Sequence, residues 1–276
     1  MPTLKKALLF HDFSAFSKSG LTVAIPVLEA LGLEAGAIPT CLLSTQTDGF
    51  GNLFIRDLSS DAMAIYEKIK SEGYSFDYIY SGFVENDSIY ELLGKVIDEE
   101  KDAFVLVDPV LGDGGKLYEG MTGSHVEEMR NLIRKADLIT PNLTEALLLT
   151  GLEGESSYSN GDLKTLFDAL SSYTEGDVVM TSVPLEIGGY SNVAFKNGDM
   201  RIFPFPDVPV EYPGSGDLFA SLLLGLLSRG NSFFPSVKIA GELSSEVIRR
   251  NWELKRERRL GVSLSPLYVL LKERVP

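Results

Sequence analysis

The sequence predicts an α/β fold in which helices cover both faces of a mostly parallel sheet, with an antiparallel hairpin at the edge of that sheet. Short apolar runs typical of buried strands alternate with helical patterns along most of the chain. Repeated strand–helix alternation is typical of a parallel sheet that is covered on both sides. An Asn-Gly pair at residues 197–198, which is a strong hairpin signal, then separates two further strand-like segments.

The expected elements follow one another in a definite order. Six apolar runs are expected to form the parallel strands, at residues 7–10, 37–43, 78–81, 103–108, 138–140 and 178–181. Five segments with helical patterns lie between them, at residues 21–31, 62–72, 88–100, 124–135 and 163–173. Segments 190–196 and 200–205 are expected to form the hairpin. A helix opening at Gly216 and another through 237–252 close the domain, and the charged stretch 253–259 is expected to be a solvated helix end or a loop.

Length and composition limit the class of protein. The 276 residues are long enough for one large domain, and we expect residues 1–276 to form it. The net charge of −14 argues against nucleic acid or an anionic membrane surface as a partner, because both need a basic face. The start of the chain has too few apolar residues for a signal peptide, and no run approaches the roughly 20 apolar residues that span a bilayer. A single cysteine, Cys41, excludes a disulfide framework and favours the reducing cytoplasm.

The stretch Pro213-Gly214-Ser215-Gly216-Asp217, followed by the apolar run 218–224, is the most informative part of the sequence. Two glycines that flank a hydroxyl residue let the backbone pass close to a ligand, and the apolar run indicates a helix that starts there. Backbone N–H groups at a helix N-terminus favour a phosphate, and Asp217 lies beside them in the first turn. A carboxylate next to a phosphate site suggests a kinase, whereas the alternative is an ordinary tight turn.

Polar residues also follow three of the expected parallel strands. In an open parallel sheet, ligands bind beyond the carboxyl ends of the strands, so these residues are candidates for one site. In chain order they are Asp108 at the end of the strand at 103–108 and Asp113 beyond it, Thr140 at the end of the strand at 138–140 with Asn142 and Glu145 beyond it, and Thr181 at the end of the strand at 178–181 with Ser182 beyond it. Each of them could instead be a helix cap, a turn residue or a locally satisfied hydroxyl.

In their order and spacing, these blocks resemble the ribokinase-like superfamily, and within it the vitamin B6 kinases. The resemblance rests on Asp108-Pro109-Val110-Leu111-Gly112-Asp113, Thr140-Pro141-Asn142 with Glu145, Thr181-Ser182 and Gly214-Ser215-Gly216-Asp217, with Ser44 and Thr47 near the end of an early strand. It implies a three-layer α/β/α fold and ATP-dependent phosphorylation of the 5′-hydroxymethyl group of pyridoxal, pyridoxine or pyridoxamine. It also implies bound Mg²⁺, a monovalent cation such as K⁺, and a homodimer.

The resemblance assigns a role to each block. Asp217 is implied as the base that accepts the hydroxyl proton, and Gly214, Ser215 and Gly216 as the anion hole for the transferred phosphoryl group. Asp108, Asp113 and Glu145 are implied to position Mg²⁺. Contacts to ATP are implied for Asp108, Thr140, Asn142, Glu145, Thr181 and Ser182, and for Val208 and Val210, which lie along the adenine or pack in the core. A helix N-terminus lowers the pKa of Asp217, but a loose transition state needs its base only late in the transfer.

On the acceptor side the sequence departs from the vitamin B6 kinases. Where those enzymes usually carry Ser-Ile-Gln-Ser, this chain has Phe10-His11-Asp12-Phe13-Ser14, so either His11 or Asp12 is expected to contact the pyridine ring. Ser44 and Thr47 are expected on the same side, with Thr47 bonded to ring substituents. Phe83 is expected to stack on the ring or to pack in the core. The glycine-rich loop 112–118 is expected to move over the nucleotide.

Two other functions stay open on the sequence alone. Hydroxymethylpyrimidine kinase of thiamine biosynthesis has the same fold and a substrate of similar shape, but usually lacks the Gly-Asp pair found here at 112–113. A non-catalytic nucleotide-binding or B6-binding relative would not need Asp217 beside an acidic cluster. Release of ADP with a panel of ring alcohols discriminates among the three.

Overall fold

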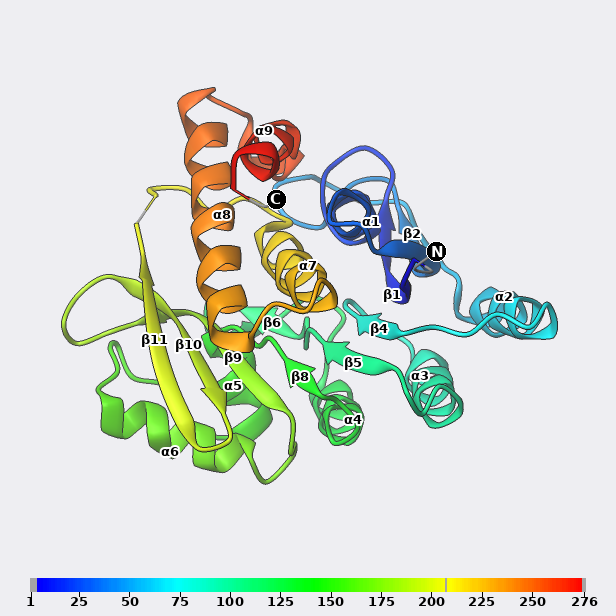
Figure 1. The fold of residues 1–276 in the computed structure, drawn as a ribbon, viewed down its shortest axis with the longest axis horizontal. Coiled ribbons are helices and arrows are strands. Elements are labelled where there is room, and N and C mark those ends of the chain that lie inside the picture. Colours follow the sequence, from blue (N-terminus) through cyan, green and yellow to red (C-terminus); the bar gives the residue numbers. More distant parts are fainter. Residues whose placement is uncertain (1–3, 207, 275–276) are drawn as a thin grey trace.

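The computed structural model describes residues 4–206 and 208–274. Residues 1–3, on which the signal-peptide expectation partly rests, lie outside the described residues. The centre of the fold is a nine-stranded sheet with the order β11-β10-β9-β8-β5-β4-β1-β2-β3 (Figure 1). Its strands are β1 (Lys6–Ser14), β2 (Glu34–Leu43), β3 (Ile55–Asp57), β4 (Tyr78–Ser81), β5 (Phe104–Val107), β8 (Leu138–Ile139), β9 (Asp177–Pro184), β10 (Tyr190–Lys196) and β11 (Asp199–Phe205). A separate small hairpin consists of β6 (Gly112–Asp113) and β7 (Lys116–Leu117).

The pairing of the strands confirms the mostly parallel sheet with an antiparallel edge hairpin. The six strands from β9 to β2 in the sheet order run parallel to one another. Strands β10 and β11 form the hairpin, and its turn holds Asn197 and Gly198 with φ angles of 52° and 83°. A two-residue turn of this kind needs positive φ at both positions, which is why Asn-Gly is favoured. Asp199 already pairs with Lys196 in β11, so the turn is one residue shorter than the sequence predicts.

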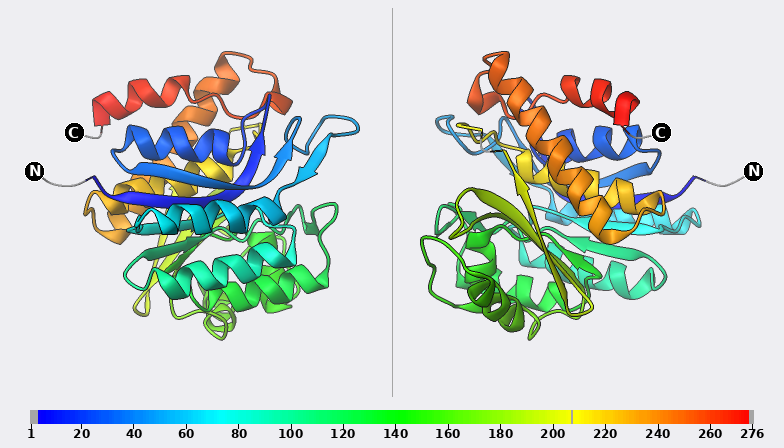
Figure 2. Two further views of the ribbon diagram at one scale, coloured as in Figure 1. Left: turned by 90° about the vertical axis from the view of Figure 1, so that its right-hand side faces the viewer. Right: turned by 60° about the vertical axis from the view of Figure 1, so that its left-hand side comes forward.

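Helices cover both faces of the sheet, so the fold has the three expected layers (Figures 1 and 2). One layer holds α1 (Leu21–Ala30), α7 (Ser215–Ser228), α8 (Phe233–Glu253) and α9 (Ser265–Arg274). The other holds α2 (Ser59–Ser71), α3 (Asp87–Glu99), α4 (Gly123–Ile133), α5 (Leu143–Thr150) and α6 (Asn160–Leu170). Each layer packs against its own face of the sheet through a separate apolar cluster.

The sequence does not predict β3, α5 or α9. All three residues of β3 are exposed, so this antiparallel edge strand has no apolar run to mark it. Helix α5 begins inside the polar motif that follows β8, at a capping box formed by Asn142 and Glu145. A capping box satisfies backbone N–H groups at the start of a helix. The residues assigned to a ligand site therefore also start a helix.

Helix α7 is apolar on almost every side because it lies between the sheet, α1 and α8. It packs closely against α1 at Gly225, where an added Cβ would lie 2.3 Å from Cδ1 of Leu31. The glycine therefore allows the two helices to approach each other. This packing fixes the direction of α7 and places its amino terminus beside β1.

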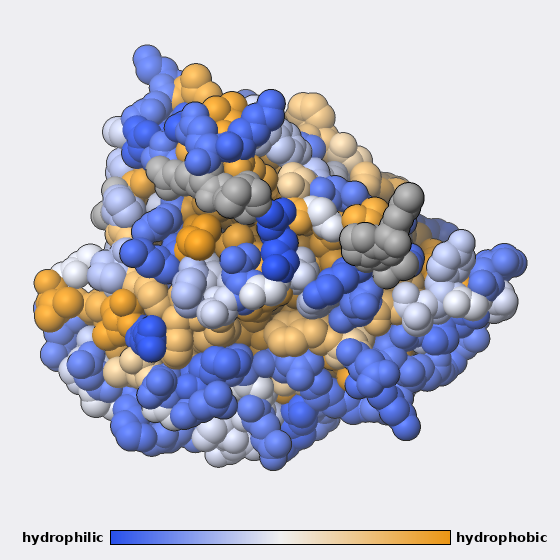
Figure 3. Space-filling model, in the orientation of Figure 1, coloured by the Kyte–Doolittle hydropathy of each residue, from blue (hydrophilic) through white to orange (hydrophobic). Residues whose placement is uncertain are grey.

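The surface in Figure 3 is mainly hydrophilic in the lower part of the view, over α4 and α6. Within residues 4–206 and 208–274, no helix combines the length and the apolar character that crossing a membrane requires.

Replacing Gly225 by alanine tests the role of the α1–α7 contact. Gly225→Ala is expected to lower the free energy of unfolding by about 1–3 kcal/mol, because the added methyl group overpacks the contact with Leu31. Urea denaturation followed by circular dichroism measures this change. Gly216→Ala in the same helix is the control, since a Cβ there meets no atom within 4 Å. Equal loss of stability in both variants would contradict the packing account.

Candidate active site

The candidate site lies where the carboxyl ends of the parallel strands meet the amino terminus of α7. The sheet order places β1 beside β4, β4 beside β5, and β5 beside β8. It therefore brings together His11 and Asp12 near the end of β1, Asp108 directly after β5, and Thr140 directly after β8. Residues that are far apart in the sequence thus share one edge of the sheet, as the sequence predicts.

Gly214 occupies a position that accepts no side chain. Its φ of 83° is in the left-handed region, and an added Cβ would lie 2.6 Å from the carbonyl oxygen of Lys18. The turn before α7 therefore packs directly against the loop that follows β1. The glycine makes this close contact possible.

The amides that follow Gly214 differ in what they can bind. The N–H of Ser215 donates to the carbonyl oxygen of Tyr212 at 3.2 Å, so this member of the expected anion hole is engaged within the turn. Gly216 is exposed and faces open space, with no atom within 4 Å of an added Cβ. Gly216 and Asp217 belong to the first turn of α7, whose amides have no acceptor within the helix and can bind an anion.

Asp217 is a buried carboxylate whose two oxygens each contact a different donor. Its Oδ1 lies 2.9 Å from Nε2 of His11, and its Oδ2 accepts a hydrogen bond from the Gly20 amide at 2.6 Å. Burial raises the pKa of the Asp217 carboxyl, but the charge of His11, its hydrogen bond and the Gly20 amide together hold that pKa below its usual value. Asp217 is therefore ionised at neutral pH.

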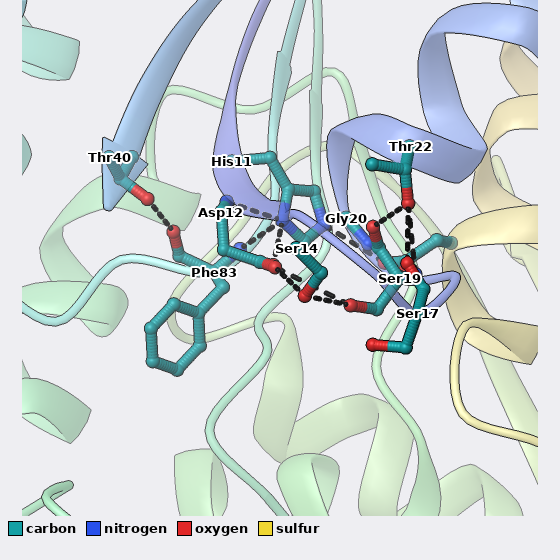
Figure 4. Close-up of polar contacts among 10 residues, drawn as sticks. His11, Asp12, Ser14, Ser17, Ser19, Gly20, Thr22, Thr40 and Phe83 are labelled. Carbon is teal, nitrogen blue, oxygen red and sulfur yellow. Dashed lines mark hydrogen bonds and ion pairs between the residues drawn. The ribbon is translucent and has the colours of Figure 1, made fainter. Parts of the chain in front are cut away.

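His11 lies between two carboxylates. Its Nδ1 is 2.8 Å from Oδ1 of Asp12 (Figure 4), and its Nε2 contacts Asp217. Burial lowers the pKa of the His11 imidazole, but the charges and hydrogen bonds of Asp217 and Asp12 outweigh burial and raise the pKa to about 10. A pKa of about 10 favours the imidazolium at neutral pH, in which Nε2 donates to Asp217 and Nδ1 to Asp12. The backbone amides of Asp12 at 2.9 Å and Phe83 at 3.3 Å also point at Nδ1.

Asp12 also organises the loop between β1 and α1. Its Oδ2 accepts hydrogen bonds from the hydroxyls of Ser14 at 3.2 Å and Ser19 at 3.5 Å (Figure 4). The Ser19 amide in turn donates to the Thr22 hydroxyl at 3.2 Å. These bonds hold the loop so that the Gly20 amide points at Asp217.

Asp108 and Glu145 form the acidic side of the site. Burial and the charge of Asp217 raise the pKa of Asp108 to about 7, although His11 and Thr140 lower it. Burial and the charge of Asp108 raise the pKa of Glu145 well above its usual range, although the amides of Asn142 and Leu111 donate to its carboxylate at 2.8 Å and 3.2 Å. A divalent cation near these two groups would relieve the repulsion between them.

The chemistry of this acidic side fits Mg²⁺. Carboxylate oxygens are the ligands that Mg²⁺ prefers, and the ion usually keeps several waters and binds phosphates as well as protein. Within the described part of the chain, no three or more His, Cys, Asp or Glu side chains are grouped as ligands of one metal ion. Asp113, the third expected metal residue, lies exposed at the tip of the β6–β7 hairpin, where its Oδ1 accepts from the Gly114 amide at 2.7 Å.

The other residues expected on the nucleotide side have structural contacts of their own. Asn142 caps α5 and donates from Nδ2 to the Gly112 carbonyl oxygen at 2.9 Å. Thr181 forms a parallel bridge with Asn142, and the exposed Ser182 has a positive φ of 55°. Val208 and Val210 are half-buried, while position 207 of the stretch 201–212 lies outside the described residues. The ATP contacts of these residues stay predictions.

The residues expected on the acceptor side lie around the ends of β2 and β4. Phe83 is half-buried, and its carbonyl oxygen accepts from the Thr40 hydroxyl at 2.9 Å (Figure 4). The Ser44 hydroxyl accepts from the Phe54 amide at 3.2 Å and so braces the loop after β2, in which Thr47 is exposed. The contacts of Ser44, Thr47 and Phe83 with a ring stay predictions.

The loop 112–118 has more structure than its glycine-rich composition suggests. It forms the β6–β7 hairpin, and the Gly115 amide donates to the Thr144 hydroxyl of α5 at 2.9 Å. Its movement over a nucleotide stays a prediction.

Comparison with known proteins identifies the family. The family model described as phosphomethylpyrimidine kinase matches residues 17–260. The chain belongs to this family. This kinase-family chain is 30% identical to pyridoxal kinase from Lactobacillus plantarum, with a TM-score of 0.90 and 98% of each chain covered. It is also 31% identical to a Bacteroides thetaiotaomicron protein whose structure was solved in an orthorhombic crystal form with pyridoxal. That comparison has a TM-score of 0.90 and covers 98% of this chain and 96% of that chain.

A curated relative agrees with these structures. Human pyridoxal kinase is 28% identical over 71% of this chain and 69% of its own length. The resemblance to the vitamin B6 kinases and to their ribokinase-like fold is thereby confirmed.

Sequence reasoning did not identify three features of this kinase-family site. One is Gly20, whose amide bonds Asp217 and whose added Cβ would lie 2.4 Å from Asp12. The only sequence signal for Gly20 is that a glycine directly precedes an expected helix. The second is the ion pair between His11 and Asp217, which no local pattern indicates. The third is the ion pair at 2.5 Å between Asp48 and Arg258, which lies in the charged stretch 253–259 and so ties the loop after β2 to the segment after α8.

Gly216→Ala separates binding of the phosphoryl group from stability. The added methyl group would enter the open space in front of the first turn of α7, so turnover is expected to fall by at least about 10²-fold, comparable to the loss of an anion-hole donor. Stability should stay equal or rise by up to about 1 kcal/mol, because alanine is the better helix former. Initial rates and thermal melts on the same preparation measure both effects. Normal turnover in a folded variant would show that this space is not the phosphoryl site.

Proposed function

We propose that this protein transfers the terminal phosphoryl group of ATP to the 5′-hydroxymethyl group of pyridoxal, pyridoxine or pyridoxamine. The proposal rests on Asp217, a buried carboxylate in the first turn of α7, beside amides that are placed for an anion. Support comes from the relatives, because the Lactobacillus plantarum and human proteins are named pyridoxal kinases. We further propose that residues 1–276 act as one kinase domain in a cytoplasmic homodimer.

In the proposed mechanism Asp217 orients the acceptor hydroxyl and takes its proton. The transition state of phosphoryl transfer is loose, so the bond to ADP is largely broken before the new bond forms. The hydroxyl therefore becomes acidic late, and a carboxylate whose pKa is lowered can still accept the proton. The first-turn amides of α7 stabilise the negative charge on the transferred group.

We propose that the acidic side of the site binds the nucleotide. Asp108 and Glu145 would hold Mg²⁺, with Asp113 as an outer contact. When bound, Mg²⁺ neutralises charge on the ATP phosphates. Thr140 and Thr181 are proposed to contact the nucleotide or a monovalent cation such as K⁺, with Asn142 and Ser182 on the same side.

The closest rival is a hydroxymethylpyrimidine kinase, because the matching family model carries the name phosphomethylpyrimidine kinase. A panel of pyridoxal, pyridoxine, pyridoxamine and hydroxymethylpyrimidine, assayed by release of ADP, decides between the two. We expect the highest kcat/KM with one of the three pyridines. A higher value with the pyrimidine would favour the rival, and no stimulation by any alcohol would favour a binding protein.

Asp217→Asn tests the assignment of the base. The amide cannot accept the hydroxyl proton, so kcat is expected to fall by about 10²–10⁴-fold. The KM for ATP should change little, because the first-turn amides remain. Asp168→Asn is the matched control, since Asp168 is an exposed carboxylate in α6 that pairs with Lys164. Near-normal kcat in the Asp217 variant would remove the base assignment even if the protein is a kinase.

Binding of Mg²⁺ with ATP is expected to release protons near neutral pH. In the free protein the pKa of Asp108 is raised to about 7, so Asp108 carries a proton in part of the molecules near neutral pH, and the pKa of Glu145 is raised as well. A cation lowers both pKa values and displaces these protons. Titration calorimetry in two buffers with different ionisation enthalpies measures the number released. The number of protons released should become smaller as the pH rises past the pKa of Asp108. If no protons are released near neutral pH, these carboxyls do not face the metal.

A further inference from the structure

We propose that His11, held in place by Asp12, is the residue that orients the Asp217 carboxylate for proton transfer. This role rests on the proposed kinase function. It differs from the contact with the pyridine ring that the sequence suggests, because His11 is 2% exposed and its ring nitrogens are already occupied. Nε2 contacts Asp217, while Nδ1 contacts the Asp12 carboxylate and the backbone amides of Asp12 and Phe83.

The contacts of Asp217 define the orientation of its carboxylate. Nε2 of His11 lies 2.9 Å from Oδ1, and the Gly20 amide lies 2.6 Å from Oδ2. Two donors on two oxygens fix the plane of the carboxylate group. A carboxylate offers about four lone-pair positions, so an acceptor hydroxyl can still donate to Asp217 while both of these bonds remain.

The His11 ring is itself held in place. Its Nδ1 lies 2.8 Å from Asp12, whose other oxygen accepts from Ser14. An added Cβ at Gly82 would lie 1.9 Å from the ring, so the glycine is needed for the ring to occupy this position. The ring also meets Tyr80 of β4 edge-on, with 6.0 Å between ring centroids. The position of β1 therefore determines, through the imidazole, where the Asp217 carboxylate on α7 lies.

The charged and titratable groups around His11 are all acidic. Asp12 comes from its own strand, Asp217 from α7, Asp108 from the segment after β5, and Tyr80 from β4. Burial disfavours a charged ring, but the carboxylates of Asp217 and Asp12 outweigh burial and raise the pKa of His11 to about 10. The same attraction lowers the pKa of Asp217. Each partner thus keeps the other charged.

The transfer step balances with His11 as a fixed cation. The O–H bond of the acceptor breaks and its proton goes to Asp217. A bond forms between the acceptor oxygen and the terminal phosphorus, and the bond from that phosphorus to the bridging oxygen breaks, leaving its electron pair on ADP. His11 keeps both ring protons throughout and is therefore a positioning residue.

Nitrogen-15 NMR of the histidine rings tests the charge state without any assay of activity. The chain has two histidines, and His125→Gln assigns the remaining ring signals to His11. We expect both ring nitrogens of His11 to stay protonated from about pH 6 to about pH 8.5, where an ordinary histidine loses its charge. Loss of a ring proton within this range would overturn the proposal.

His11→Gln tests the functional role. Its amide can still donate to Asp217 but carries no charge, so the pKa of the buried Asp217 should rise. The acidic limb of the kcat–pH profile is therefore expected to move to higher pH by about 1–3 units. At neutral pH kcat should fall more than the KM for ATP changes. Asp12→Asn should move the limb in the same direction by less, and His125→Gln should leave it in place.

The outcomes separate this role from the proposed function. A wild-type protein that phosphorylates no ring alcohol would remove the proposed function, while the NMR result would still decide the charged pair. If the wild type phosphorylates a ring alcohol but the acidic limb of a folded His11→Gln variant does not move, the role of His11 is overturned while the proposed function stands. Thermal melts check folding, and if His11→Gln does not fold, the limb of Asp12→Asn decides by the same criterion.

Discussion

The contact between His11 and Asp217 joins residues that are 206 positions apart in the chain, and the candidate site depends on it. His11 is placed by β1, which lies between β4 and β2 in the sheet, and Asp217 by the first turn of α7. The contact forms because Gly225 lets α7 pack closely on α1, while Gly20 and Gly82 make room beside the two side chains. The site is therefore a property of the whole fold and of these glycines in particular.

Charge is the second constraint on this site. The chain has a net charge of −14, and four buried carboxyls, Asp12, Asp108, Glu145 and Asp217, lie at one edge of the sheet. A site for an anionic nucleotide needs positive charge, which backbone amides at the start of α7 supply in part. His11 is a further buried cation, and Mg²⁺ would act beside Asp108 and Glu145. The acidic groups are thus divided between holding a cation and accepting a proton.

The sequence could predict those parts of the site that follow local or topological rules. The turn at Gly214 is indicated by its glycines and the apolar run that follows them. The residues after β5 and β8 are indicated because ligands bind at the carboxyl ends of parallel strands. The pairing of His11 with Asp217 could not be found in this way, because it depends on the three-dimensional approach of two distant segments. The amide of Ser215 was assigned to the anion hole, but its bond to Tyr212 depends on the detailed path of the turn. Strand β3 was missed because three exposed residues produce no apolar pattern.

Identification of the product tests the central claim most directly. The protein would be incubated with ATP, Mg²⁺ and pyridoxal, and the mixture followed by phosphorus NMR and mass spectrometry. Our account predicts a phosphate monoester on the 5′-hydroxymethyl group, formed in step with ADP. Inorganic phosphate in place of the ester, or no consumption of ATP with any ring alcohol, would contradict it.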